Sequence, residues 1–258
     1  MGVDFGRTAN DYARYRTVFP PELFSRLAEL NIGVAGQRLV DLGTGTGVLA
    51  RVFAAAGCTV TGLDVAPEML DQAREQDRAA GVSVTYRVGG AERTGLPGQE
   101  WDAVTAGQCW HWFDRPRVAA EVRRLLVDGG ALAICYRDYS GAVSEAAEEL
   151  VHVYNPTWPL GGLTFDNRPE WVEELRAAGF GSVEYFGFDT TVEFTHEQWR
   201  GRMLQRGRRE PDRGAGGRVR RRSGHAVAGT LPGRAVERAA PHLGDRGAVI
   251  TASSGSWR

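Results

Sequence analysis

Short apolar runs alternate with amphipathic runs along the first half of the chain. Runs bounded by turn residues predict buried strands at 38–41, 58–63, 82–88, 102–106 and 131–136. Apolar residues at helical spacing predict helices at 48–56, 67–80 and 116–126. Strands that alternate with helices indicate an α/β fold, with a mostly parallel sheet covered by helices on both faces. Between the third and fourth strands, 89–100 is typical of a loop.

The second half breaks this alternation and then changes in composition. A helix at 170–178, a strand at 182–188 and a strand-then-helix pattern at 191–205 are still predicted. Residues 201–258 hold 13 arginines and four acidic residues, whereas the first 200 hold 18 arginines and 28 acidic residues. Sustained periodicity is absent from this tail, except at 248–252.

The bulk properties exclude several classes of protein. The chain has 258 residues and a net charge of −1, which argues neither for nor against a nucleic-acid partner. No apolar run approaches the roughly 18 residues of a membrane span, so we expect a cytoplasmic protein without a membrane partner. Cys58, Cys109 and Cys135 lack metal-ligand or disulfide spacing, which predicts free buried thiols and no metal site.

A glycine-rich turn, Gly43-Thr-Gly45-Thr-Gly47, lies between the first strand and the first helix after it. Glycine allows a sharp turn with φ > 0 and lets a ligand approach the backbone closely. A dinucleotide fingerprint would place the third glycine one residue later. Asp41 stands two residues before the turn, and its negative charge suits a ligand with a sulfonium and an aminoacyl group.

A second acidic residue, Asp64, ends the second strand, 17 residues after Gly47. A carboxylate at this position can accept hydrogen bonds from both hydroxyls of a ribose, which contribute roughly 1.5–3 kcal/mol. The alternative is a helix N-cap, because Asp64 precedes a predicted helix. The glycine turn nearby favours the ribose.

Three further segments complete a family pattern. They are the block Gly107-Gln-Cys-Trp-His-Trp-Phe-Asp114, the segment Gly89-Gly-Ala-Glu-Arg-Thr-Gly-Leu-Pro97 and Tyr12-Ala-Arg-Tyr-Arg16 near the start. With them, about residues 5–200 resemble the class I S-adenosylmethionine (SAM)-dependent methyltransferases, type 11 branch, and within it the trans-aconitate methyltransferase-like group. The resemblance implies a Rossmann-like fold and SAM as cofactor. It also implies methyl transfer to a small-molecule substrate, with a carboxylate or hydroxyl oxygen favoured.

The resemblance also implies a set of cofactor-binding residues. Tyr15 and Arg16 would close over the aminoacyl end of SAM. Gly90 replaces an Asp that is common in the family, so the adenine contact falls to Ala91 and Glu92. Met69 would touch adenine or, alternatively, belong to the core. The whole set is Tyr15, Arg16, Asp41, Gly43, Thr44, Gly45, Asp64, Val65, Met69, Ala91, Glu92 and Gln108.

His111 is the candidate catalytic residue. It follows the fourth strand, on the side to which the transferable methyl must point. A neutral imidazole there could accept a proton from a substrate hydroxyl. Alternatively, it orients the substrate or packs among Trp110, Trp112 and Phe113, because alignment of the reactants alone can contribute roughly 7–11 kcal/mol.

By the same resemblance, residues 1–200 form the methyltransferase domain. Residues 5–20 and 137–170 are lid elements, although ordinary packing of a long connection also explains 137–170. Such domains usually end in a pair of strands, and only 248–252 could pair with 183–188. We therefore expect an incomplete terminal hairpin and a poorly ordered 201–258 tail. A basic interaction arm or, favoured, a reading-frame shift near residue 201 would explain the tail.

Two other functions remain open. A nucleic-acid methyltransferase could use the basic tail as an electrostatic arm. Residues 108–112 stand where such an enzyme would carry an Asn/Asp-Pro-Pro-Tyr-like base-flipping motif, and this disfavours a nucleic-acid partner. A SAM-binding protein without catalytic activity is the second alternative. The oligomeric state has no sequence indicator.

Overall fold

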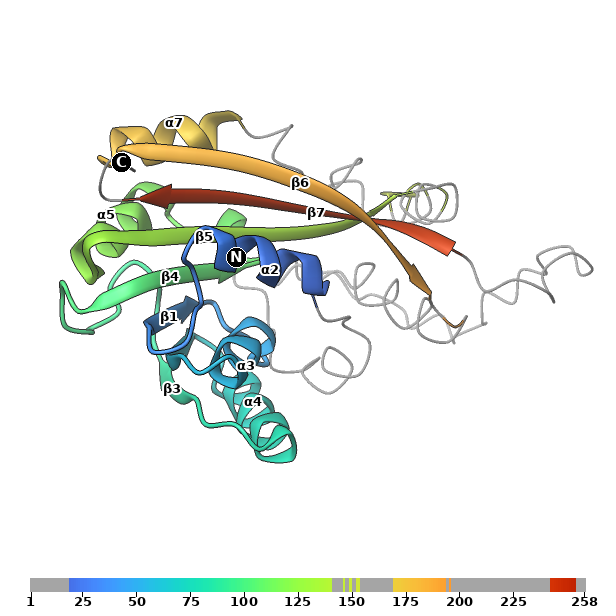
Figure 1. Cartoon of the computed structure of the whole chain (residues 1–258), viewed down its shortest axis with the longest axis horizontal. Coiled ribbons are helices and arrows are strands. Elements are labelled where there is room, and N and C mark those ends of the chain that lie inside the picture. Colours follow the sequence, from blue (N-terminus) through green and yellow to red (C-terminus); the bar gives the residue numbers. More distant parts are fainter. Residues whose placement is uncertain are drawn as a thin grey trace, which may run out of the picture.

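A single twisted sheet runs through the protein (Figure 1). The computed structural model describes residues 19–140, 146, 149, 152–153, 169–193, 195 and 242–253. The strand order is β3-β2-β1-β4-β5-β7-β6, and of these β7 runs antiparallel to both of its neighbours. The strands are β1 Arg38–Leu42, β2 Thr59–Asp64, β3 Thr85–Val88, β4 Trp101–Gly107, β5 Leu126–Ser140, β6 Ser182–Glu193 and β7 His242–Ser253.

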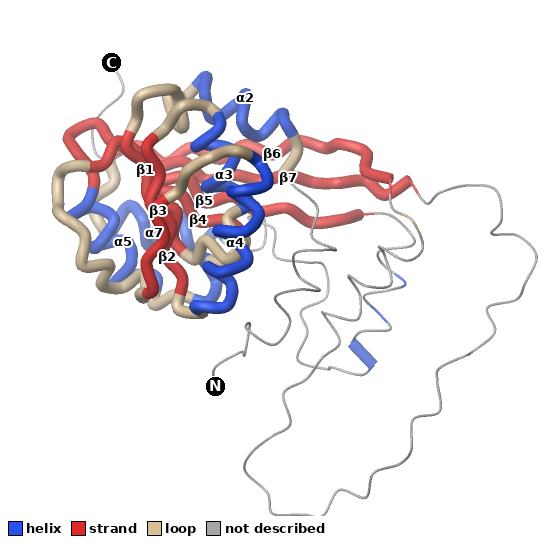
Figure 2. The backbone as a smooth tube through the Cα atoms, turned by 90° about the horizontal axis from the view of Figure 1, so that it is seen from below, coloured by secondary structure: helices blue, strands red, loops and turns tan. Residues whose placement is uncertain are grey.

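Helices cover both faces of this sheet (Figure 2). On one face, α5 and α7 pack on a core that includes Val40, Val104 and Ile134. On the other face, α2 and α3 pack on Leu39 and Ala133, because neighbouring residues of a strand point to opposite faces. The described helices are α2 Pro21–Glu29, α3 Val48–Ala55, α4 Pro67–Ala80, the 3₁₀ helix η2 Trp110–Trp112, α5 Arg115–Leu125 and α7 Pro169–Ala177.

This arrangement confirms the predicted Rossmann-like α/β fold. Segment 89–100, predicted as a loop, contains neither helix nor strand. The third strand is shorter than predicted, because at the sheet edge it pairs only with β2, over Thr85–Val88. Strands β5 and β6 are longer than the fifth and sixth predicted strands, because most of β7 pairs with both of them. Most of the two expected lids, 5–18 and 154–168, lies outside the described residues.

Strand β7 corrects the expectation of an incomplete terminal hairpin. It lies between β5 and β6, with Ile250 opposite Ile134 on one side and Tyr185 on the other. Val249 and Ile250 are fully buried, one on each face of the sheet. The sequence indicated only the second half of this strand, 248–252, because the first half, His242–Gly247, lacks β-branched residues. The preceding segment, 201–241, lies outside the described residues, so the two explanations of the tail stay predictions.

A half-buried ion pair joins the two helices on one face. Arg115, at the start of α5, donates from Nε and Nη2 to the two carboxylate oxygens of Glu174 in α7, at 2.6 and 2.9 Å. This two-bond geometry is the strong form of an Arg–carboxylate pair. The Arg115 guanidinium also lies 6.0 Å from the ring of Trp171, which is fully buried. The start of α5, directly after the block 107–114, is therefore held in place.

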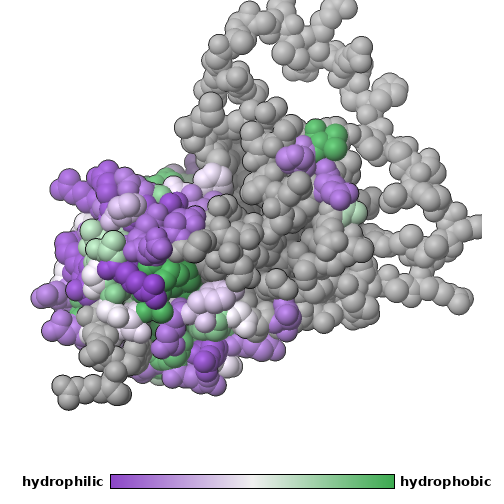
Figure 3. Space-filling model, turned by 90° about the horizontal axis from the view of Figure 1, so that it is seen from above, coloured by the Kyte–Doolittle hydropathy of each residue, from purple (hydrophilic) through white to green (hydrophobic). Residues whose placement is uncertain are grey.

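The coloured surface in Figure 3 is mainly hydrophilic, with smaller apolar areas between polar ones. Among the described residues, the large apolar side chains that are exposed include Val65, Val88 and Trp112. None of the described helices combines the length and apolar character that crossing a bilayer requires.

The position of β7 can be tested by shortening one of its side chains. Ile250→Ala should lower the free energy of unfolding by about 2–5 kcal/mol, because it leaves a cavity between the sheet and its helices. Val88→Ala is the control, since Val88 is 62% exposed and its loss should change stability by less than about 0.5 kcal/mol. Urea unfolding measures both. Equal, small effects would show that β7 is not part of the core.

Candidate functional site

The glycine turn after β1 has the backbone conformation that its sequence predicts. Gly43, Gly45 and Gly47 have φ values of +59°, +56° and +75°, a region that costs other L-residues about 1–2 kcal/mol each. At Gly43 a side chain is also excluded by space. A Cβ there would lie 2.9 Å from Cys109 Sγ and 3.2 Å from Phe113 Cζ. The turn therefore lies directly against the segment that follows β4.

Asp41, in β1, stabilises this turn through buried hydrogen bonds. Its carboxylate is 2% exposed and accepts hydrogen bonds from the hydroxyls of Thr44, at 2.6 Å, and Thr105, at 2.7 Å. Burial raises the pKa of Asp41 from 3.8 to about 6; the two hydroxyls oppose this shift and the nearby Asp64 adds to it. Asp41 thereby joins β1, β4 and the turn through one buried carboxyl group.

Asp64, the last residue of β2, is bound to the same turn. Its Oδ2 accepts a hydrogen bond from the Gly45 amide at 2.8 Å, and its Oδ1 accepts one from the Ala66 amide at 2.9 Å. The second bond is a local turn contact and does not make Asp64 the helix N-cap, because the N-cap of α4 is Ala66, which has no side-chain cap bond. An ionised carboxylate offers about four acceptor positions, so two amides leave capacity for a ligand hydroxyl.

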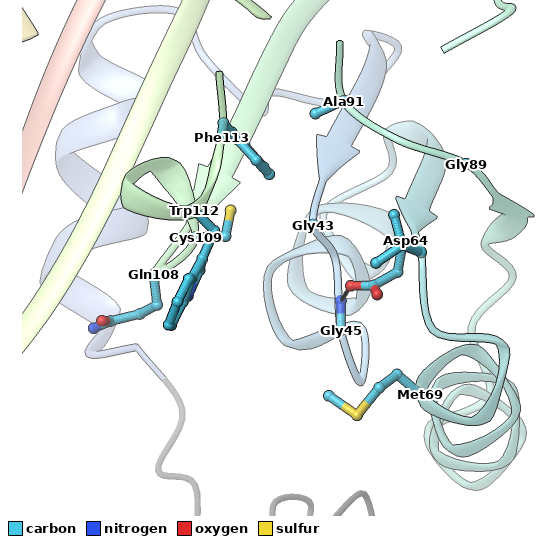
Figure 4. A pocket seen from close by; sticks show the side chains of 12 residues that line it. Gly43, Gly45, Asp64, Met69, Gly89, Ala91, Gln108, Cys109, Trp112 and Phe113 are labelled. Atoms are coloured by element: carbon cyan, nitrogen blue, oxygen red, sulfur yellow. Dashed lines mark hydrogen bonds between the residues drawn. The ribbon is translucent and has the colours of Figure 1, made fainter. Parts of the chain in front are cut away.

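A pocket opens between these loops, at the carboxyl ends of β1, β2 and β4 (Figure 4). The turn and Asp64 form one wall, with Met69 of α4 beside them, and the block after β4 forms the facing wall. Its lining is mostly apolar, with one carboxylate and one amide side chain. The lining residues are Gly43, Gly45, Asp64, Val65, Met69, Gly89, Ala91, Gly107, Gln108, Cys109, Trp112 and Phe113.

The facing wall is held by a residue with an unusual backbone. Gln108 has a φ of +60°, and its Nε2 donates to the Arg137 carbonyl at 2.6 Å. Its backbone amide donates to the Cys135 carbonyl at 2.9 Å. These bonds to β5 stabilise the sharp turn that starts the block, and Cys109 adds a contact from Sγ to the Leu42 carbonyl at 3.2 Å.

His111 lies in η2, within the block after β4, but it does not line the pocket itself. Its ring centroid is 4.7 Å from that of Trp112, which lines the pocket and is 57% exposed. His111 Nδ1 lies 2.6 Å from the hydroxyl of Tyr136, and the His111 backbone amide donates to the same oxygen at 3.1 Å. Tyr136 was not among the predicted site residues. The signal that could have identified it is a polar aromatic residue at the end of an otherwise apolar predicted strand, 131–136.

The structure brings most of the predicted cofactor residues together. Gly43, Gly45, Asp64, Val65, Met69, Ala91 and Gln108 line the pocket. Asp41, Thr44 and Glu92 do not line it: Asp41 accepts from the Thr44 hydroxyl, and Glu92, in the loop after β3, accepts from the Asp114 amide. Tyr15 and Arg16 lie outside the described residues. Five further lining residues were not predicted, although all of them belong to the motifs already noted: Gly89, Gly107, Cys109, Trp112 and Phe113.

Comparisons with known proteins agree with this geometry. Residues 40–134 match the family described as methyltransferase domain, type 11. An uncharacterized methyltransferase of Mycobacterium tuberculosis is 37% identical over 136 residues, 53% of each chain, so the match spans about half of that relative. An uncharacterized methyltransferase-like protein of Schizosaccharomyces pombe is 30% identical over 193 residues, 72% of each chain.

Two further proteins extend the comparison: one is a relative whose name gives its substrate, and the other is a solved structure. The malonyl-[acyl-carrier protein] O-methyltransferase of Serratia marcescens is 28% identical, covering 69% of this chain and 71% of its own. The structure of Haemonchus contortus phosphoethanolamine N-methyltransferase 2 in complex with SAM has a TM-score of 0.57 at 19% identity. The structural match covers 97% of this chain and 57% of the Haemonchus chain. At this identity the structural match shows the fold.

The chain belongs to the class I SAM-dependent methyltransferases, and SAM is the cofactor of this superfamily. The pocket fits that cofactor. A side chain at Gly43 would meet the facing wall, and a fixed carboxylate, Asp64, stands beside the turn with acceptor capacity left. Apolar residues such as Met69 line the rest.

The glycine turn can be tested with a matched pair of variants. Gly45→Ala and Gly81→Ala both place an alanine at positive φ, +56° and +68°, and both should cost about 1–2 kcal/mol of stability. Gly45 lines the pocket, whereas a Cβ at Gly81 meets no atom within 4 Å. Calorimetric titration with SAM should therefore show at least about tenfold weaker binding for Gly45→Ala and unchanged binding for Gly81→Ala. Equal affinities would place the cofactor elsewhere.

The buried carboxyl of Asp41 predicts a pH dependence of stability. The folded chain keeps the Asp41 proton up to about pH 6, whereas the unfolded chain releases it near 3.8, so the folded state binds more protons between these values. Stability should therefore fall in this window as pH rises. From pH 4 to 7, Asp41→Asn should gain about 2–2.5 kcal/mol of stability relative to the wild type. Urea unfolding across this range measures the difference, and a constant difference would contradict a raised pKa.

Proposed function

We propose that the protein transfers the methyl group of SAM to a small-molecule acceptor. The main support for this proposal is the pocket at the carboxyl edge of the sheet, where the glycine turn, the Asp64 carboxylate and the block after β4 meet. Ligands bind at this edge in open α/β sheets. When bound, SAM supplies a methyl group on a positively charged sulfur, which is already reactive toward an oxygen or nitrogen nucleophile.

The chain's own residues then have distinct binding roles. Asp64 would accept the ribose hydroxyls, and Val65, Met69 and Ala91 would contact the adenine. Gly43 and Gly45 would follow the aminoacyl end, with Gln108 on the opposite wall. Asp41, Thr44 and Glu92, which do not line the pocket, would hold these loops in position. Tyr15 and Arg16 would complete the site from the lid.

An oxygen acceptor, a carboxylate or a hydroxyl, is the favoured substrate group. The Trp112 side of the pocket is aromatic and part-exposed, which suits a small organic molecule. The Serratia relative is named as an O-methyltransferase of malonyl-[acyl-carrier protein], which supports oxygen as the acceptor atom. The block ending in His111-Trp-Phe-Asp114 supports the trans-aconitate methyltransferase-like group, whose substrate class is a small acid.

The cofactor role of Asp64 can be measured without a known substrate. Asp64→Ala should weaken SAM binding roughly ten- to hundredfold, because it removes a charged acceptor worth about 1.5–3 kcal/mol. Asp71→Ala is the control, since that carboxylate is 75% exposed on α4 and pairs only locally with Arg74. Calorimetry gives both affinities. If Asp64→Ala is destabilised but binds SAM as tightly as the wild type, Asp64 has only the structural role of bonding the Gly45 and Ala66 amides.

The activity itself requires a screen of acceptors. The purified chain, incubated with SAM carrying a deuterated methyl group and a metabolite extract, should transfer that label to a small acid or hydroxyl compound detectable by mass spectrometry. Asp64→Ala should lose the signal in proportion to its lost affinity. Binding of SAM without transfer to any compound would support the non-catalytic alternative. Transfer to RNA or DNA that salt suppresses would support a nucleic-acid substrate.

A further inference from the structure

The structure gives His111 a partner inside the core. Tyr136, in β5, is 2% exposed, and its hydroxyl contacts both the ring Nδ1 and the backbone amide of His111. The Tyr136 ring packs against Trp171 with centroids 5.3 Å apart, and Trp171 is 1% exposed. The Arg115–Glu174 pair fixes α7, which carries Trp171, to α5. The hydroxyl is therefore presented from a rigid support.

The chemistry of the two groups decides which one donates. A tyrosine hydroxyl, with a pKa near 10, is a much better donor than a neutral imidazole N–H, and an imidazole nitrogen is a much better acceptor than a phenol oxygen. The backbone amide of His111 already donates to the hydroxyl oxygen. Both facts favour a hydroxyl that donates its proton to Nδ1 across the 2.6 Å contact.

This direction fixes the tautomer of His111. A neutral imidazole that accepts at Nδ1 carries its proton on Nε2. Nδ1 faces the buried hydroxyl, whereas the ring is part-exposed, so the edge that carries Nε2 is turned away from the core. The ring of His111 lies 4.7 Å from that of Trp112, which lines the pocket, so His111 is one residue removed from the pocket wall.

We propose that Tyr136 is a positioning residue that holds His111 as an Nε2–H hydrogen-bond donor toward the methyl acceptor. His111 then orients an acceptor atom and does not remove its proton. An acceptor that arrives already deprotonated, as a carboxylate does at neutral pH, meets this requirement and needs no base. The role toward the acceptor rests on the proposed function, whereas the tautomer of His111 does not.

Nitrogen NMR of the full-length chain tests the tautomer without cofactor or substrate. In protein labelled with ¹⁵N-histidine, His111→Gln identifies the His111 signals among the five histidines. The wild type should show a single Nε2–H tautomer with an unprotonated Nδ1. Tyr136→Phe, which removes only the hydroxyl, should show exchange between the two tautomers. A proton on Nδ1 in the wild type, or identical spectra for both proteins, would overturn the proposal.

Turnover then tests the role toward the acceptor. Glutamine also donates a hydrogen bond but accepts no proton at neutral pH. The turnover rate of His111→Gln should therefore lie within about tenfold of the wild-type rate, and the turnover rate of His111→Ala should be lower still. Tyr136→Phe should lower turnover when introduced into the wild type but should cause no further loss in His111→Ala, because the effects of substitutions at residues that act through one another are not additive. Equal losses for His111→Gln and His111→Ala would instead make His111 a base. If the NMR result holds and no acceptor is methylated, the proposed function fails alone.

Discussion

The hydrogen bond from the Gly45 amide to the Asp64 carboxylate joins the two loops on which the pocket depends. Each loop follows a different strand, and parallel pairing of β1 with β2 brings the two strand ends to one edge. The Ala66 amide fixes the other carboxylate oxygen, so the orientation of the group is set from both sides. A ligand hydroxyl at Asp64 would therefore meet an acceptor that is already oriented, and its binding would not have to order the carboxylate.

The opposite wall of the pocket depends on β5 and on what lies beyond it. Gln108 bonds to the carbonyls of Cys135 and Arg137, and His111 bonds to the hydroxyl of Tyr136, so β5 holds the block after β4 at two points. Strand β7 pairs with the outer edge of β5 over Ala131–Ser140. Strand β7 thus stabilises the strand that supports the candidate substrate side of the site.

Local patterns and distant contacts differ in how well the sequence predicted them. The alternation of strands and helices, the turn at Gly43–Gly47 and the position of Asp64 could be predicted, because each depends on residues close together in the chain. The contact of Tyr136 with His111 joins residues 25 positions apart in different elements, and no local pattern announces it. Strand β7 could be predicted only at 248–252, where Val249 and Ile250 are buried, because the rest of its length depends on pairing with β5 and β6, which are distant in the sequence.

A crystal structure of the chain with S-adenosylhomocysteine tests the central claim most directly. The account predicts both ribose hydroxyls within hydrogen-bond distance, about 2.5–3.2 Å, of the Asp64 carboxylate, which keeps its bonds to the Gly45 and Ala66 amides. It also predicts the amino-acid part of the ligand against Gly43 and Gly45, and the adenine beside Met69 and Ala91. A nucleoside bound anywhere else, or an Asp64 carboxylate that contacts only its two backbone amides, would contradict the account.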